Sequence, residues 1–471
     1  MKRLLYFAAC ILFLTQVQAN EPVARLDSLM DLFHNHNNFT GSVLVAKNGE
    51  ILYAKGFGYA NIEHRIENAP CMKYRIASIS KQFTAMLILQ KVSEGSMRLD
   101  ATVAEYIPDY PQPQGDVITI HHLLSHTSGM PHYAGIPGFF PLYGRQFFEH
   151  RDFVELFWDL ELMWNPGERY SYSSFGYYLL GYILEEVSGK KFNDLLAERV
   201  LNPLQMYDSG IEDHRSIMMN RAEGYDFLLD GFIRAEFRDL STALATGDMY
   251  TTPHDMVLWD AALREHSLLD SEHQELLFRP NLNGYAYGWN VGYRTINNTD
   301  SVYFQQHTGG TNGFTSIGTR LPEDGYYILV FCNTRPGEIR PIERNIVRIL
   351  YGEEIDFSRS ITLATARILE SEGLDPALEY LRLQLDTNGE PQTGLQHIST
   401  LGRDLLWLNR YGEAIAFFSL GTSLFPGSAQ AEMMLGDAHR AAGQEEEAVK
   451  AYARALLINP QHRGSLQRLG Q

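Results

Sequence analysis

The chain has 471 residues, of which 45% are hydrophobic and 20% charged, so it is longer than one ordinary domain and can bury a substantial core. Its formal net charge of −18 argues against nucleic acid and against anionic membrane surfaces as partners. The charge does not indicate which small molecule or peptide would be a substrate.

Residues 1–19 have the pattern of a secretory signal. Lys2 and Arg3 precede an apolar run over residues 4–14, and small residues lead to Ala19. We therefore predict a signal peptide over residues 1–19 and a secreted or periplasmic protein. Two alternatives remain, a lipoprotein anchored through Cys10 and an N-terminal anchor that is retained. We predict no transmembrane segment, because no other stretch is long and apolar enough.

The first element of the mature chain is a predicted β-hairpin over residues 41–56. Apolar side chains alternate on both sides of Asn48-Gly49, a pair typical of two-residue hairpin turns. A second hairpin is predicted near residue 320, where residues 315–320 and 326–332 flank a Pro-Glu-Asp-Gly turn. Strands at both ends of this region predict one antiparallel sheet built from both ends.

The segment Tyr74–Lys81 opens a predicted helix over residues 81–94. The three-residue spacing places Ser78 and Lys81 on one helical face, side by side. A serine hydroxyl becomes a good nucleophile when a neighbouring base takes its proton, and a buried lysine can be that base. Alternatively, Ser78 only caps the helix.

A turn rich in Pro, Gly and Ser over residues 165–174 leads into a predicted helix over residues 175–187. Tyr172 lies where its phenol can point out of this turn, and a tyrosine beside a lysine can relay a proton. The alternative is an ordinary loop aromatic. A further helix is predicted over residues 253–263.

The third candidate element precedes the second hairpin. His307, Thr308, Gly309 and Gly310 follow one another there, and the glycines let a substrate backbone lie close to the strand. Thr308 offers a hydroxyl, and the Gly310 amide could face an oxyanion. The alternative is a plain turn with a surface histidine.

From about residue 362 helical periodicity replaces the strand and turn signals. A 34-residue repeat is visible in four matched pairs: Leu401-Gly402 with Leu435-Gly436, Ala414 with Ala448, Phe418 with Tyr452, and Pro426 with Pro460. This pattern resembles tetratricopeptide repeats, with a degenerate third copy over residues 365–391. We predict such an all-α domain over residues 362–471. It either binds a protein partner or only packs.

The elements around Ser78, Tyr172 and His307, in this order, resemble the penicillin-recognising serine hydrolases, which include class C β-lactamases, D-Ala-D-Ala carboxypeptidases, D-aminopeptidases and esterases. The resemblance implies an α+β fold over residues 25–355, with an antiparallel sheet flanked by helices and a helical insertion.

Carried over by position, the resemblance makes Ser78 the acylated nucleophile, with Lys81 and Tyr172 sharing the acid and base work. His307, Thr308 and Gly309 would form a substrate-binding wall, and the amides of Ser78 and Gly310 the oxyanion hole. The expected reaction is acyl transfer to Ser78 followed by hydrolysis of a peptide, amide or ester.

Two positions depart from the family pattern. Ser174 stands where the second motif usually has Asn, and a hydroxyl reaches less far than an amide. His307 stands where the third motif usually has Lys, and a histidine is mostly uncharged near pH 7. Both favour a carboxypeptidase, D-aminopeptidase or esterase over a β-lactamase. The alternative is a non-catalytic penicillin-binding-like protein that binds cell-wall fragments and a protein partner.

No cofactor or metal is predicted. Cys71 and Cys332 are the cysteines left after signal cleavage, and they could be paired or free. The spacing of the histidines of the helical insertion fits no standard zinc site; these are His121, His122, His126 and His132.

Overall fold

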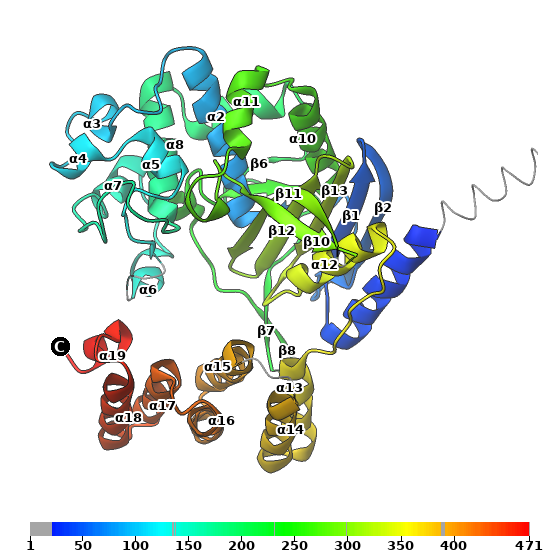
Figure 1. The fold of residues 1–471 in the computed structure, drawn as a ribbon, viewed down its shortest axis with the longest axis vertical. Coiled ribbons are helices and arrows are strands. Elements are labelled where there is room, and N and C mark those ends of the chain that lie inside the picture. The colour runs from blue at the N-terminus through cyan, green and yellow to red at the C-terminus, as the bar shows by residue number, and fades with distance from the viewer. Residues whose placement is uncertain are drawn as a thin grey trace, which may run out of the picture. The chain divides into compact units, whose positions relative to one another are not determined.

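The computed structural model describes residues 21–133, 136, 138–229, 231–297, 299–387 and 391–470 (Figure 1). The predicted signal peptide over residues 1–19 lies outside these residues. The chain divides into two compact units. The first comprises Met1–Asp226 and Arg234–Phe357, and the second Phe227–Ile233 and Ser358–Gln471.

A six-stranded antiparallel sheet forms the centre of the first unit. Its strand order is β10-β11-β12-β13-β1-β2, so β1 from the start of the unit pairs with β13 from its end. The strands are β10 (Asn290–Ile296), β11 (Asp300–Thr311), β12 (Phe314–Leu321), β13 (Tyr326–Cys332), β1 (Gly41–Lys47) and β2 (Glu50–Phe57). This topology confirms the predicted sheet built from both ends.

Both predicted hairpins are confirmed. Asn48 and Gly49 turn the chain between β1 and β2 with φ values of 52° and 86°, the left-handed conformations that a tight two-residue turn requires. Strands β12 and β13 pair in register around the second turn.

Each face of the sheet carries its own hydrophobic core, because side chains alternate along the strands. Val43 and Val45 of β1 belong to the core under the helix over residues 21–37 and α12 (Ile339–Leu350). Leu44 and Ala46 face the opposite core, which also holds α2 (Ser80–Ser93) and α8 (Ser174–Ser188).

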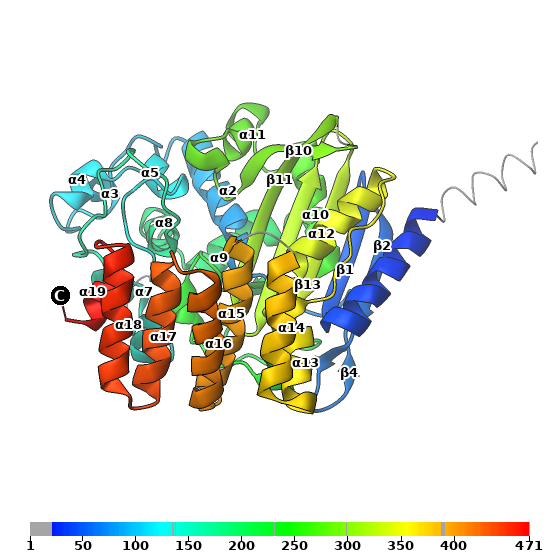
Figure 2. The same ribbon diagram turned by 60° about the horizontal axis from the view of Figure 1, so that its bottom comes forward.

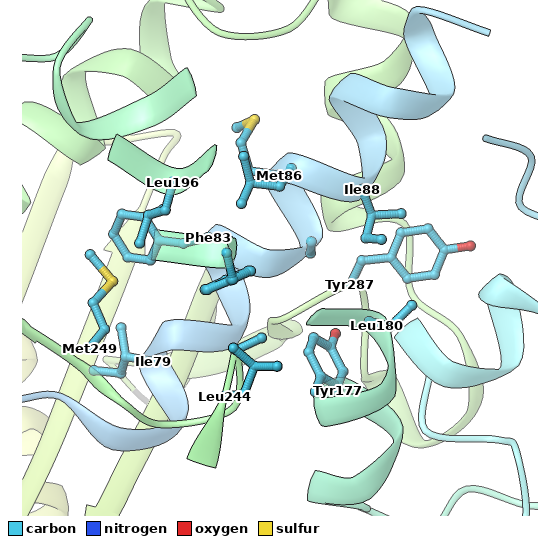
Figure 3. Close-up of a cluster of buried hydrophobic side chains, with 14 of the residues drawn as sticks. Ile79, Phe83, Met86, Ile88, Tyr177, Leu180, Leu196, Leu244, Met249 and Tyr287 are labelled. Carbon is cyan, nitrogen blue, oxygen red and sulfur yellow. The ribbon is translucent and has the colours of Figure 1, made fainter. Parts of the chain in front are cut away.

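Helix α2 is buried on all sides through its first three turns, from Ser80 to Gln90. Its apolar side chains contact α8 and the segments around Leu196, Leu244 and Met249 (Figure 3). Phe83 also stacks on Trp259, with ring centroids 4.2 Å apart. A helix apolar all round belongs in a core, and this one carries Lys81 into it.

The remaining elements of the first unit are short segments and covering helices. The helices are α3 (Val103–Tyr106), α4 (Gln114–Val117), α5 (Ile120–Leu124), α6 (Phe139–Tyr143), α7 (His150–Glu155), α9 (Phe192–Leu196), α10 (Pro253–Glu265) and α11 (Ser271–Phe278). The tight 3-10 turns are η1 (Ala77–Ile79), η4 (Leu240–Ala243) and η5 (Leu282–Gly284), and η3 (Ala197–Leu201) is a π-helical segment. The smaller sheets contain β3 (Tyr59–Asn61) with β4 (Ile66–Glu67), and β5 (Tyr74–Arg75) with β9 (Met249–Thr251) and β6 (Gly210–Ile211). Strand β14 (Thr334–Arg335) pairs with the start of β7 (Tyr225–Leu228), and β7 and β8 (Gly231–Arg234) run through the segment Phe227–Ile233 that belongs to the second unit.

The second unit is helical apart from the hairpin segment Phe227–Ile233. Its helices run side by side in chain order (Figure 2). They are α13 (Ile361–Glu372), α14 (Leu374–Thr387), α15 (Pro391–Trp407), α16 (Tyr411–Leu424), α17 (Ala429–Ala441), α18 (Glu445–Ile458) and α19 (Arg463–Arg468). Gly402 lies against the Phe418 ring, and Gly436 lies against the Tyr452 ring. The fold class is therefore α+β followed by an all-helical region, as predicted.

No helix in the described ranges has the length and apolar character needed to cross a membrane. Both described cysteines are free thiols, with Cys71 exposed and Cys332 buried.

Candidate active site

Ser78 lies in the tight turn η1, directly before α2. The preceding Ala77 has a φ of 48°, a conformation that costs energy in any residue with a Cβ. The Ser316 hydroxyl of β12 donates to the Ile76 carbonyl at 2.8 Å and holds the turn against the sheet. The strained turn leaves Ser78 partly exposed between a strand and a buried helix.

Lys81 is fully buried one helical turn after Ser78. Its Nζ lies 3.3 Å from Ser78 Oγ and donates to the Thr246 carbonyl at 2.8 Å. Burial lowers the pKa of Lys81 well below its ordinary value, Arg238 lowers it further, and Asp248 opposes both. A lysine in these surroundings can accept the Ser78 proton.

Tyr172 lies near both Lys81 and Ser78, and the Nζ of Lys81 is 5.0 Å from the centroid of the tyrosine ring. The phenol oxygen is buried and forms no hydrogen bond of ordinary geometry within the described part of the chain. Burial raises the pKa of Tyr172 well above its ordinary value, and the nearby Ser78 hydroxyl opposes that rise. Tyr172 therefore keeps its proton at neutral pH, which leaves the neutral amine of Lys81 as the base available to Ser78.

Strand β11 forms a third wall. A Cβ at Gly309 would lie 2.1 Å from the Ile76 carbonyl oxygen, so only glycine allows the strand this close to the turn that holds Ser78. A Cβ added to the neighbouring Gly310 would have no other heavy atom within 4 Å, and Gly310 is exposed. Thr308 is partly exposed between Gly309 and His307.

His307 is buried and uncharged. Its Nδ1 lies 2.7 Å from the Thr308 carbonyl oxygen, which can only accept, so Nδ1 carries the proton. Its Nε2 then accepts from the Tyr285 hydroxyl at 3.1 Å. Burial, with a smaller effect of Lys81, lowers the pKa of His307 to about 3. His307 therefore supplies no positive charge to a substrate at neutral pH.

Ser174 is buried in the first turn of α8, whose N-cap is Ser173. Within the described part of the chain no hydrogen bond joins Ser174 to Lys81, which donates to the Thr246 carbonyl instead. The structure thus brings together Ser78, Lys81, Tyr172 and the β11 wall, whereas Ser174 has no direct bond to Lys81.

The sequence did not predict the roles of two residues of this site, His126 and Asp248. The His126 ring packs at a tilt against two tyrosine rings, with centroids 4.3 Å from Tyr172 and 4.6 Å from Tyr285. Its Nδ1 accepts from the Ser173 amide at 3.2 Å, so in the neutral ring the proton is on Nε2. Asp248 is buried, and burial raises its pKa to about 7. The sequence neighbours of these residues gave no hint of their proximity to Lys81.

The histidines of the helical insertion make separate contacts. His121 Nδ1 lies 2.6 Å from the Tyr287 hydroxyl, whereas His122 accepts from the Thr119 amide at the start of α5. Among the described residues, no group of three or more His, Cys, Asp or Glu side chains is arranged to hold a metal ion.

The chain is similar to known proteins. A family model described as Beta-lactamase matches residues 26–352. Protein flp of Staphylococcus aureus strain MW2 is 28% identical over 330 residues, which cover 67% of this chain and 64% of that protein. The chain thus spans less than two thirds of this relative.

Two solved structures are similar. The octameric penicillin-binding protein homologue from Pyrococcus abyssi has a TM-score of 0.62 at 26% identity, over 74% of this chain and 81% of its own. The D-amino acid amidase from Ochrobactrum anthropi SV3, complexed with D-phenylalanine, has a TM-score of 0.61 at 24% identity, over 70% and 98%. The second likeness concerns the fold alone.

Proposed function

This chain belongs to the Beta-lactamase family, and from that premise we propose that it is a serine hydrolase that forms an acyl-enzyme on Ser78. The observation that carries the proposal is the 3.3 Å approach of Lys81 Nζ to Ser78 Oγ inside the core. Burial lowers the pKa of Lys81, so its neutral amine can act as the base that a serine nucleophile needs.

In the proposed reaction, Ser78 Oγ attacks the substrate carbonyl carbon while its proton passes to Lys81 Nζ. The amides of Ser78 and Gly310 hold the oxyanion of the tetrahedral intermediate. Tyr172 gives its proton to the leaving amine or alcohol and regains one from Lys81, which leaves an ester on Ser78. Water then attacks this ester, and the same groups move its protons in reverse order.

The proposed substrates are peptides, amides or esters of the D-Ala-D-Ala carboxypeptidase, D-aminopeptidase or esterase type. β-Lactams are disfavoured as substrates because His307 is uncharged and Ser174 has no bond to Lys81.

The protein is further proposed to act outside the cytoplasm after cleavage of residues 1–19. The helices over residues 361–468 are proposed to be a tetratricopeptide-like array that binds a protein partner. Support for the array comes from glycine–aromatic contacts repeated 34 residues apart, Gly402 with Phe418 and Gly436 with Tyr452.

An active-site serine probe and an activated ester test the proposal. The wild type should be labelled and release a burst of alcohol, whereas Ser78→Ala should do neither. Ser93→Ala, at the exposed end of the same helix, is the control and should behave as the wild type.

Lys81→Ala should slow acylation by several orders of magnitude. Equal labelling of the wild type and Ser78→Ala would exclude Ser78 as the nucleophile. Absence of any burst would favour the non-catalytic, cell-wall-binding alternative.

A further inference from the structure

Arg238 is a buried cation without an ionic partner among the described residues. Its residue is 5% exposed, and its guanidinium carbon lies 5.2 Å from the ring centroids of both Tyr133 and Phe140. Its hydrogen bonds are long ones to Thr242, at 3.3 Å to the hydroxyl and 3.3 Å to the carbonyl. A guanidinium has five N–H donors, so this one has donors to spare.

The carboxylates next to Arg238 in the chain are engaged elsewhere. Asp239 lies 3.8 Å from His214 and caps the turn η4, and Glu236 pairs with Arg145 at 3.0 Å. Within the described residues no carboxylate forms an ion pair with Arg238. Burying a charge without a counter-charge costs free energy. Binding of an anion from solution would balance the charge of Arg238.

Arg238 belongs to the Lys81 side of the candidate site. Tyr133, under its guanidinium, contacts the His132 ring at 4.3 Å, and His132 lies 5.6 Å from the Tyr172 ring. The charge of Arg238 lowers the pKa of Lys81 and of His132, whereas His307 responds to Lys81 and Arg340 instead. Arg238 is therefore connected to the Lys81 side of the site through Tyr133 and His132.

The other ionisable groups around Lys81 do not provide a fixed positive charge. Burial lowers the pKa of His126 well below its ordinary value, that of His132 to about 4 and that of His307 to about 3. Lys81 is itself shifted toward its neutral form. The chain as a whole carries a net charge of −18, which repels anions. Arg238 is the guanidinium that acts on Lys81 itself, so it can select an anionic substrate on this side of the site.

We propose that Arg238 binds a carboxylate of the substrate, in a subsite on the His132 side of Ser78. A planar guanidinium matches a carboxylate through two parallel N–H···O bonds, which an ammonium or a neutral imidazole cannot reproduce. This assignment rests on the proposed hydrolase activity and narrows it to substrates that carry a negative charge.

Matched ester pairs test the assignment. One pair places the carboxylate on the acyl part, mono-p-nitrophenyl adipate against p-nitrophenyl hexanoate. The other pair places it on the leaving group, 3-carboxyphenyl acetate against phenyl acetate. The wild type should prefer the anionic member of one pair by about 10-fold or more in kcat/KM, the range expected for a charge-assisted hydrogen bond.

Arg238→Gln should abolish this preference, measured as the ratio of kcat/KM for the anionic over the neutral member of each pair, because a change in the pKa of Lys81 alters both members alike and cancels in the ratio. Arg238→Lys keeps the charge without the planar fork and should retain only part of the preference. Labelling of Ser78 in each variant by an uncharged serine probe reports whether the site is still folded.

The possible results separate the two proposals. Hydrolysis of both members of each pair at equal rates by the wild type would overturn the role of Arg238 and leave the hydrolase proposal intact. A preference that survives in a folded Arg238→Gln protein would also overturn it. Failure of the wild type to hydrolyse any of the four esters would count against the hydrolase proposal itself.

Discussion

The Oδ2 atom of Asp248 accepts a hydrogen bond from the Ala245 amide at 3.2 Å, and this bond closes a turn in which Ala245 has a φ of 58°. That conformation is costly for alanine, so the turn needs support. The Ala245 carbonyl accepts from the Thr84 hydroxyl at 2.7 Å, and the Thr246 carbonyl accepts from Lys81. Asp248 thus holds the turn that presents two carbonyl groups to α2.

Asp248 should make the protein less stable as the pH rises. Burial raises its pKa from 3.8 to about 7, so between these values the folded state binds a proton that the unfolded state has lost. The free energy of unfolding therefore falls from about pH 4 to beyond pH 7, by on the order of a few kcal/mol. Asp248→Asn should remove this fall in urea unfolding at pH 5 and pH 8, whereas Asp116→Asn, at an exposed carboxylate, should keep it. An unchanged slope in Asp248→Asn would contradict this.

Tyr172→Phe should separate catalysis from folding. The phenol oxygen has no hydrogen-bond partner among the described residues, while the ring packs on His126. Removing the hydroxyl should therefore leave the melting temperature nearly unchanged and lower kcat by about 10²- to 10⁴-fold, the usual contribution of a proton-transfer group. Parallel melting curves and ester kinetics provide the measurement. A fully active Tyr172→Phe protein would show that Tyr172 does not transfer the proton.

Two adjacent glycines should respond differently to the same substitution. A Cβ at Gly309 would collide with the Ile76 carbonyl and lie 2.4 Å from the Ser316 hydroxyl, whereas Gly310 faces open space. Gly309→Ala should push β11 away from the Ser78 turn and lower stability by roughly 1–3 kcal/mol or more. Gly310→Ala should leave the melting temperature unchanged. Equal melting temperatures for the two variants would contradict the close approach of β11 to the turn.

The sequence was most informative where the evidence is local. The alternating side chains around Asn48-Gly49 predicted β1 and β2, and the three-residue spacing of Ser78 and Lys81 predicted their contact. The family resemblance then supplied the order of the longer-range elements, including Tyr172 and His307. Both kinds of evidence can be read from the amino-acid sequence alone, because each depends on a sequence motif.

The sequence could not predict contacts that depend on packing between distant segments. The Thr246 carbonyl reaches Lys81 only because α2 and the loop after η4 are buried together. Arg238 and Asp248 are ordinary charged residues in the sequence, and burial alone gives them their electrostatic roles. Burial of this kind is a property of the folded tertiary structure and leaves no periodic pattern along the chain.

The helical unit offers a matched pair of glycines for a separate test. A Cβ at Gly402 would lie 2.3 Å from the Phe418 ring, whereas Gly412 on α16 has nothing within 4 Å. Gly402→Ala should destabilise the helices by about 1–3 kcal/mol through overpacking. Gly412→Ala should keep or raise their stability, because alanine favours helix. Hydrogen exchange over residues 391–470 of the full chain measures both, and equal protection in the two variants would contradict the packing.

The pairing of β1 with β13 has a consequence for how the protein is made. Val43 of β1 is opposite Val330 of β13, so two neighbouring strands of the sheet come from the two ends of the unit. Contacts this distant in sequence form slowly, because the intervening chain must be gathered first. During synthesis Ser78 and Lys81 emerge long before β11 and β13. The nascent chain therefore carries its nucleophile for most of its elongation without the wall that completes the site, and activity should appear only after residue 332 has left the ribosome.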